Sequence, residues 1–176
     1  YSLEPIFVSP SMIMKYDELL LSLKNRERIL TAVRSGVIKA VLYTARPSLP
    51  PNVEDPNHYY SSEAEMAASL AGLVDLPLVG LGSMQWLARD SDLEPDSYVK
   101  PSPVHAIAAI GTAASDVDPA LMRAAHSLGQ DGKFTHPILG LKGENIHVRV
   151  FEDSAHSIQA VQHAVDILIH VGIPAK

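Results

Sequence analysis

The sequence contains no cysteine, which excludes disulfide bonds, thiolate metal sites and cysteine nucleophiles together. This absence is typical of a protein from a reducing compartment. The chain also lacks an apolar run of the ~18 residues that a membrane span requires. No basic segment followed by an apolar stretch opens the sequence, as a signal peptide would. We therefore expect a cytoplasmic protein without a membrane partner.

An excess of positive charge is absent as well. The chain has 14 Lys and Arg against 20 Asp and Glu, a formal net charge of -6. Proteins that bind the phosphate backbone of nucleic acids usually carry clustered Lys and Arg. The basic cluster at residues 24–28 falls in a helical pattern and includes Glu27, which favours a solvent-exposed helix face. We therefore expect no nucleic-acid partner.

Length and patterning predict one α/β domain over residues 1–176. Hydrophobic residues at 47% and charged residues at 19% are typical of a globular protein. Strand and helix patterns alternate, which predicts a three-layer Rossmann-like parallel sheet with helices on both faces and no large cap. We expect strands at residues 5–8, 37–43, 76–81 and 148–151, and helices at residues 14–34, 62–73, 101–110, 118–128 and from 154 onward.

Two adjacent carboxylates follow the last predicted strand. Residues 148–151 form an apolar, β-branched run that ends in Glu152 and Asp153, and a helical pattern begins just behind it. The carboxyl ends of parallel strands are where ligands bind in open α/β sheets. Paired carboxylates there suit Mg²⁺, which completes its coordination with water and phosphate oxygens. The alternative is that Asp153 or Ser154 only caps the following helix.

Two further polar residues stand at corresponding places in the chain. Thr44 ends the apolar strand at residues 37–43, and Lys100 precedes a proline-initiated helix. In this order, Thr44, Lys100 and the pair Glu152-Asp153 resemble the second, third and fourth motifs of the haloacid dehalogenase (HAD) superfamily, mostly Mg²⁺-dependent phosphatases. The resemblance implies that Thr44 and Lys100 bind phosphate, that Lys100 also takes part in catalysis, and that Glu152 and Asp153 hold Mg²⁺.

The first motif of that superfamily, a strand followed by Asp-x-Asp, is degenerate in this chain. The apolar run at residues 5–8 ends in Ser9-Pro10-Ser11, so that Ser9 and Ser11 stand where the catalytic aspartates are expected. The first aspartate would attack phosphorus and the second would act as general acid and base. A serine hydroxyl cannot protonate a leaving group as a carboxylic acid does, and it is a weak nucleophile without an activating base.

Three interpretations of function follow from the serines. The first is a HAD-like binding or regulatory module with a degenerate phosphatase site, weakened Mg²⁺ binding and a phosphorylated ligand. The second is an active phosphomonoester phosphatase whose nucleophile lies upstream of Tyr1 or is Asp17. The third is a scaffold, with a protein partner or a homo-oligomer contacting Tyr59 and Tyr60 or a histidine face. That face consists of His156, His163 and His170, whose seven-residue spacing is too wide for a typical zinc site.

Overall fold

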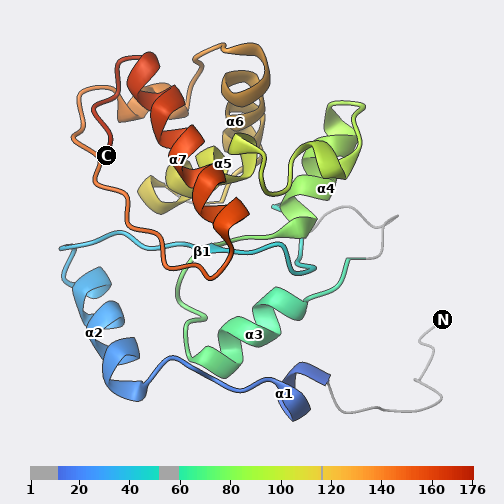
Figure 1. Cartoon of the computed structure of the whole chain (residues 1–176), viewed down its shortest axis with the longest axis vertical. Coiled ribbons are helices and arrows are strands. Elements are labelled where there is room, and N and C mark those ends of the chain that lie inside the picture. Colours follow the sequence, from blue (N-terminus) through green and yellow to red (C-terminus); the bar gives the residue numbers. More distant parts are fainter. Residues whose placement is uncertain (1–11, 52–59, 116) are drawn as a thin grey trace.

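The computed structural model describes residues 12–51, 60–115 and 117–176 and consists mainly of helices (Figure 1). The α-helices are α1 (Met12–Tyr16), α2 (Leu23–Arg34), α3 (Glu63–Ala71), α4 (Leu81–Asp90), α5 (Pro103–Ala114), α6 (Pro119–Asp131) and α7 (Ala155–His170). The remaining elements are the strands β1 (Leu42–Tyr43) and β2 (Leu78–Val79) and the 3-10 helices η1 (Pro95–Ser97) and η2 (Ile138–Leu141). No helix in these residues has both the length and the apolar character needed to cross a membrane.

The predicted three-layer Rossmann-like sheet is wrong. Within the described ranges, the only sheet pairs β1 with β2 in parallel, with Leu42 opposite Leu78. Residues 148–151 form no strand, and Phe151 is 92% exposed instead of buried. Apolar, β-branched composition predicts a strand only where another strand pairs with it, and pairing depends on tertiary structure. The strand predicted at residues 5–8 lies outside the described residues.

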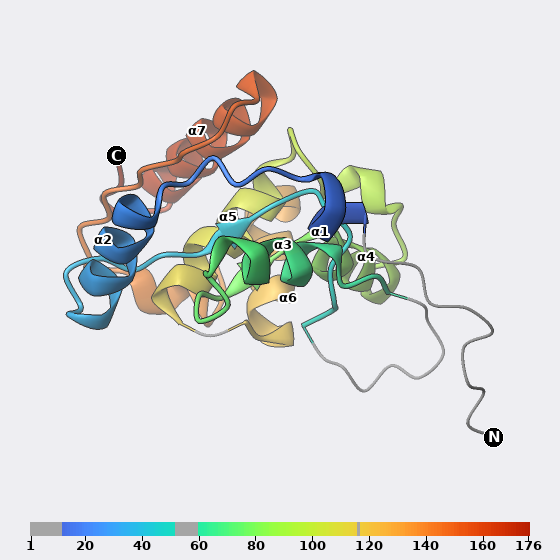
Figure 2. The same ribbon diagram turned by 90° about the horizontal axis from the view of Figure 1, so that it is seen from below.

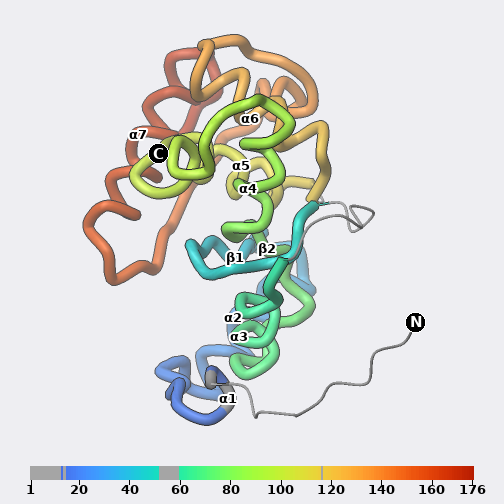
Figure 3. Tube along the Cα trace, turned by 90° about the vertical axis from the view of Figure 1, so that its right-hand side faces the viewer, coloured from blue at the N-terminus to red at the C-terminus, as the bar shows by residue number. Residues whose placement is uncertain are grey.

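Helix α5 is the centre of the main core. It contacts α6, α7 and both strands, and most of its side chains are buried. Small residues allow this close packing: a Cβ added to Gly111 of α5 would lie 2.6 Å from Leu121, and one added to Gly129 of α6 would lie 2.6 Å from Val104. The α4–α7 group therefore forms one compact layer above the strands, as Figure 3 shows.

A second, smaller core covers the opposite side of β1. Leu30 of α2 packs with Leu73 and Leu76, and Leu42 contacts this cluster, whereas the neighbouring Tyr43 contacts the main core. Successive side chains of a strand point to opposite faces, which explains this division. Figure 2 shows α2 and α3 on the same side of the molecule.

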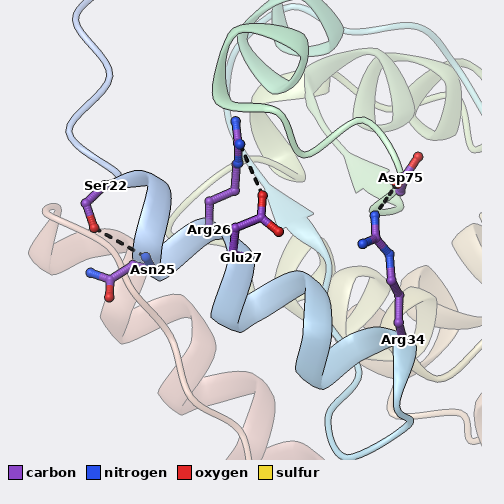
Figure 4. A network of polar contacts seen from close by, with 6 residues as sticks. All are labelled: Ser22, Asn25, Arg26, Glu27, Arg34 and Asp75. Carbon is purple, nitrogen blue, oxygen red and sulfur yellow. Dashed lines mark hydrogen bonds and ion pairs between the residues drawn. The ribbon is translucent and has the colours of Figure 1, made fainter.

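The long helix predicted at residues 14–34 is interrupted. Residues 17–22 are not helical, and α2 begins after Ser22, whose Oγ accepts a hydrogen bond of 3.3 Å from the backbone N–H of Asn25 (Figure 4). Asp17, just after α1, pairs with Arg46 at 2.8 Å. Serine is a preferred N-cap, so Ser22 favours a helix that begins directly after it. The ion pair with Arg46 holds Asp17 outside α1. Apolar periodicity alone did not reveal this break.

Helix α4 begins where the sequence predicted the end of a strand. The first turn of α4 lies close to the segment after β1, and the backbone N–H of Gly82 donates a 2.9 Å hydrogen bond to Oγ of the buried Ser48. Only glycine fits here, since it has no Cβ. A Cβ at Gly82 would lie 2.0 Å from the carbonyl oxygen of Ser48. The close approach joins the segment after β1 to the first turn of α4.

Replacement of Gly82 by alanine should therefore destabilise the protein. The clashing atoms belong to the backbone and cannot rotate away, so we expect Gly82→Ala to lower the free energy of unfolding by about 3 kcal/mol. Gly140→Ala is the matched control, since no atom lies within 4 Å of a Cβ there. Urea denaturation measures both variants, and equal midpoints would contradict the described contact.

Candidate functional site

A pocket of about 840 Å³ lies at the carboxyl end of β1. Thr44 follows β1 directly, Lys100 lies between η1 and α5, and Glu152 lies just before α7. These three residues, which the sequence placed in three separate motifs, line the same pocket. The complete lining consists of Tyr43, Thr44, Ala45, Arg46, Pro47, Lys100, Pro101, Glu152, Ser154, His156 and Ser157.

An ion pair between Lys100 and Glu152 dominates the pocket. The Lys100 ammonium donates a hydrogen bond of 2.6 Å to Oε2 of Glu152, and the two side chains are only 12% and 17% exposed. The same ammonium lies 4.1 Å from the centroid of the Tyr43 ring. A cation over an aromatic face is stabilised by the ring quadrupole. Lys100 is thus held from two sides, and its charge is fixed at the base of the pocket.

The pocket shifts the pKa values of Glu152 and Tyr43 in opposite directions. Burial alone would raise the pKa of Glu152, but the hydrogen bond and positive charge of Lys100, with hydrogen bonds to Asp153 and the Ser154 backbone, outweigh it, and the pKa falls below its usual value. Burial, together with the negative charge of Glu152, raises the pKa of the Tyr43 hydroxyl well above its usual range. Glu152 is therefore a carboxylate at neutral pH, and Tyr43 remains a neutral phenol.

His105 of α5 supports Tyr43 from inside the core. Its ring meets the Tyr43 ring edge to face at 4.5 Å between centroids, and its Nε2 lies 3.1 Å from the carbonyl oxygen of Val79. Nδ1 of His105 and the hydroxyl of Tyr43 are buried without a hydrogen-bond partner. Complete burial, aided by the charge of Lys100, lowers the pKa of His105 to about 4. A neutral imidazole therefore lies between β1, β2 and α5.

Thr44 and Arg46 shape the rim. Oγ1 of Thr44 accepts a hydrogen bond of 3.1 Å from the backbone N–H of Arg46, which closes a tight turn directly after β1. The Arg46 guanidinium contacts Asp17 at 2.8 Å, where both side chains are partly exposed. Asp17, the alternative nucleophile in the sequence, thus lies beside the rim as the partner of an arginine and follows α1 instead of lying within a long helix.

The first turn of α7 forms the opposite wall. Ser154 occupies the N-cap position, although its side chain makes no capping hydrogen bond. His156 is exposed and lines the pocket, while Ser157 beside it is buried. A helix N-terminus carries a partial positive charge and unpaired backbone N–H groups. His163 and His170, further along α7, are also exposed, and their role as a contact face stays a prediction.

The predicted Mg²⁺ ligands do not form a metal site by themselves. Asp153 is exposed and does not line the pocket, and Glu152 is already paired with Lys100. Among the residues that the structure describes, no group of three or more His, Asp or Glu side chains could hold a metal ion. Glu152 and Asp153 therefore do not act as a joint pair of ligands in this pocket, and the Mg²⁺ site stays a prediction. Ser9, Ser11 and Tyr59 lie outside the described residues, and Tyr60 is half-buried.

Sequence reasoning missed two side chains that shape the pocket. Tyr43 contributes its ring to the Lys100 site, and Arg46 contributes a second cation at the rim. Each stands within two residues of Thr44, so proximity to that motif was the available signal. The aromatic contact of Lys100 has no sequence signature, because it joins segments that are distant along the chain.

Removal of the Lys100 charge should reverse the pKa shift of Glu152. In Lys100→Met, the carboxylate loses the hydrogen bond and the positive charge that most oppose its burial, so we expect the pKa of Glu152 to rise from its wild-type value. Carbon-13 NMR of the Glu152 carboxyl across a pH titration measures the change. Lys142→Met, at an exposed lysine outside the pocket, should leave the titration unaltered. An unchanged midpoint in Lys100→Met would show that the ion pair does not control Glu152.

His105 should make the stability of the fold depend on pH. Its pKa is lower in the folded protein than in the unfolded chain, so the unfolded chain binds the extra proton between about pH 6.5 and 4. Stability is complete above that window and decreases as the pH falls through it, by about 3 kcal/mol in total. His105→Gln should show a flatter profile in urea denaturation, whereas His163→Gln, at an exposed histidine, should keep the wild-type slope.

No family model, no curated protein and no solved structure matches this chain. The resemblance to the HAD superfamily therefore stays a prediction. What the structure contributes is a pocket in which a lysine, a carboxylate and a threonine from separate segments lie together.

Proposed function

We propose that the pocket binds the phosphate group of a phosphorylated ligand, and that the chain is a binding or regulatory module that does not hydrolyse it. The observation that carries this proposal is the presence of the Thr44 hydroxyl and the Lys100 ammonium in one pocket. A hydroxyl donor and a point positive charge are groups that commonly bind phosphate. These are also the two residues to which the family resemblance assigns phosphate binding.

The balance of charge in the pocket favours an anionic ligand. Lys100 and Arg46 supply two cations to the lining, against the one carboxylate of Glu152; Asp17, the partner of Arg46, lies outside the lining. The N-terminus of α7 adds a partial positive charge on the facing wall, where Ser154 and His156 lie. A phosphate that enters the pocket would displace the Glu152 carboxylate from Lys100. The phosphate oxygens would then accept hydrogen bonds from the Lys100 ammonium.

Hydrolysis of a bound phosphate ester would need an activated nucleophile, which the described lining residues do not supply. None of the described hydroxyl groups that line the pocket is hydrogen-bonded to His156 or to Glu152, so no base is positioned to activate an attack. Glu152 itself is occupied by Lys100 and has a lowered pKa, which makes it a poor general acid at neutral pH. Binding without hydrolysis is therefore the function that these side chains support best.

Calorimetric titration with inorganic phosphate tests the proposal. Lys100→Met should weaken binding tenfold or more, since a hydrogen bond to a charged group is worth about 1.5 to 3 kcal/mol. Glu152→Gln should strengthen binding, because it removes a negative charge while preserving the shape of the side chain. If the Lys100–Glu152 ion pair only stabilised the fold, the loss of either side chain would change phosphate binding in the same direction. Opposite effects on affinity therefore distinguish direct binding from a structural role.

Lys142→Met is the control, because this lysine lies outside the pocket and its variant should bind phosphate like the wild-type protein. Equal affinities for wild type and Lys100→Met would refute the proposed site. Turnover of p-nitrophenyl phosphate that requires Mg²⁺ would replace the binding module by the active phosphatase of the second interpretation.

A further inference from the structure

The first turn of α7 brings a histidine to the pocket. His156 is exposed and belongs to the lining, together with Arg46, Lys100 and Glu152. Figure 1 shows this end of α7 next to β1, where the pocket lies. Histidine is the side chain whose charge ordinarily changes between about pH 5 and 8, whereas an arginine, a lysine and a carboxylate ordinarily keep their charges through that range.

The two permanent cations of the lining are each paired with a carboxylate. The Lys100 ammonium donates to Glu152 at 2.6 Å, and the Arg46 guanidinium contacts Asp17 at 2.8 Å. His156 has no hydrogen-bond or ion-pair partner of this kind among the residues that the structure describes. Its protonation is therefore the event that changes the charge of the pocket near neutral pH.

Each wall of the pocket presents charged or titratable groups toward His156. They are Tyr43 and Arg46 after β1, Lys100 before α5 and Glu152 before α7, with Asp17 and Asp153 outside the lining. Burial keeps Tyr43 a neutral phenol, and the lowered pKa of Glu152 keeps that side chain ionised. When His156 is neutral, the cations of the lining and their ion-pair partners balance in charge. When it is protonated, one positive charge is added beside the partial positive charge at the start of α7.

We infer that His156 controls anion binding in the pocket: the pocket binds its anionic ligand tightly when the imidazole is protonated and releases it as the pH rises and histidine loses its proton. This inference rests on the proposed phosphate site and names the residue that regulates it. An imidazolium donates a charge-assisted hydrogen bond to a phosphate oxygen, and a neutral imidazole offers only a weaker one. The bound anion in turn favours the protonated ring, because the two equilibria are linked.

Calorimetric titration with sulfate between about pH 5.5 and about pH 8 tests the role of His156. Sulfate is a tetrahedral anion like phosphate and keeps two charges throughout, whereas a phosphate monoester gains its second charge at about pH 6 and would obscure the effect of the protein. The affinity for sulfate should fall by about tenfold or more across this range, since a hydrogen bond to a charged group is lost. The buried His105, whose pKa is about 4, stays neutral meanwhile.

Three variants isolate the contribution of His156. His156→Gln should bind sulfate at every pH with the weak affinity that the wild-type protein shows at about pH 8. His156→Lys should bind tightly through the whole range, because the replacement carries a permanent charge. His163→Gln, at an exposed histidine of α7 outside the pocket, should keep the pH dependence of the wild-type protein. Both positions are exposed, so these changes leave the core packing intact.

Proton uptake on binding is a second measurement. If protonation strengthens sulfate binding, then sulfate binding must take up protons from the solvent. Calorimetry in buffers of different ionisation enthalpy detects this uptake as a heat that depends on the buffer. The wild-type protein should take up a fraction of a proton midway through the range, and His156→Gln should take up none. A residue that only supported the fold would not change this quantity.

Two results would overturn the role of His156 alone. The first is equal sulfate affinity of the wild-type protein at both ends of the pH range, and the second is a pH dependence that survives in His156→Gln. Sulfate binding that Lys100→Met weakens but that does not depend on pH would keep the phosphate site and reject its control by His156. Absence of sulfate binding at every pH would overturn both proposals, so their failures are distinguishable.

Discussion

The close packing around α5 is the constraint on which both the core and the pocket depend. Its alanines and glycine let α6, α7 and the strands approach within contact distance of its backbone. The same helix begins directly behind Lys100, and its His105 supports the Tyr43 ring. A shift of α5 would therefore move the ammonium of Lys100 and the aromatic face beneath it together.

The pocket is built around a charge that the fold has to hold in place. Burial of a lysine or a glutamate alone is costly, and each of Lys100 and Glu152 offsets that cost for the other. The Tyr43 ring stabilises the ammonium further without adding a negative charge. The Lys100 charge is therefore compensated by protein groups alone.

Local signals in the sequence determined several elements correctly. Pro103 begins α5, and Asp118 caps α6 by accepting a hydrogen bond of 2.7 Å from the Ala120 N–H, because caps and prolines act within a single turn. Ser62 and Glu65 have the spacing of a capping box, yet Ser62 makes no capping hydrogen bond and Glu65 accepts one of 2.9 Å from the Leu49 amide. That contact joins distant segments, so it competes with the local motif only in the folded chain.

The sequence by itself also determined which three segments carry Thr44, Lys100 and Glu152, since each follows an apolar run or precedes a helix start. Only the tertiary structure decided that they share a pocket, that Tyr43 and Arg46 belong to it, and that residues 148–151 form no buried strand. The physical reason is the range of the interactions. Caps, turns and helical periodicity depend on neighbouring residues, whereas strand pairing, ion pairs and cation–aromatic contacts depend on segments that only packing brings together.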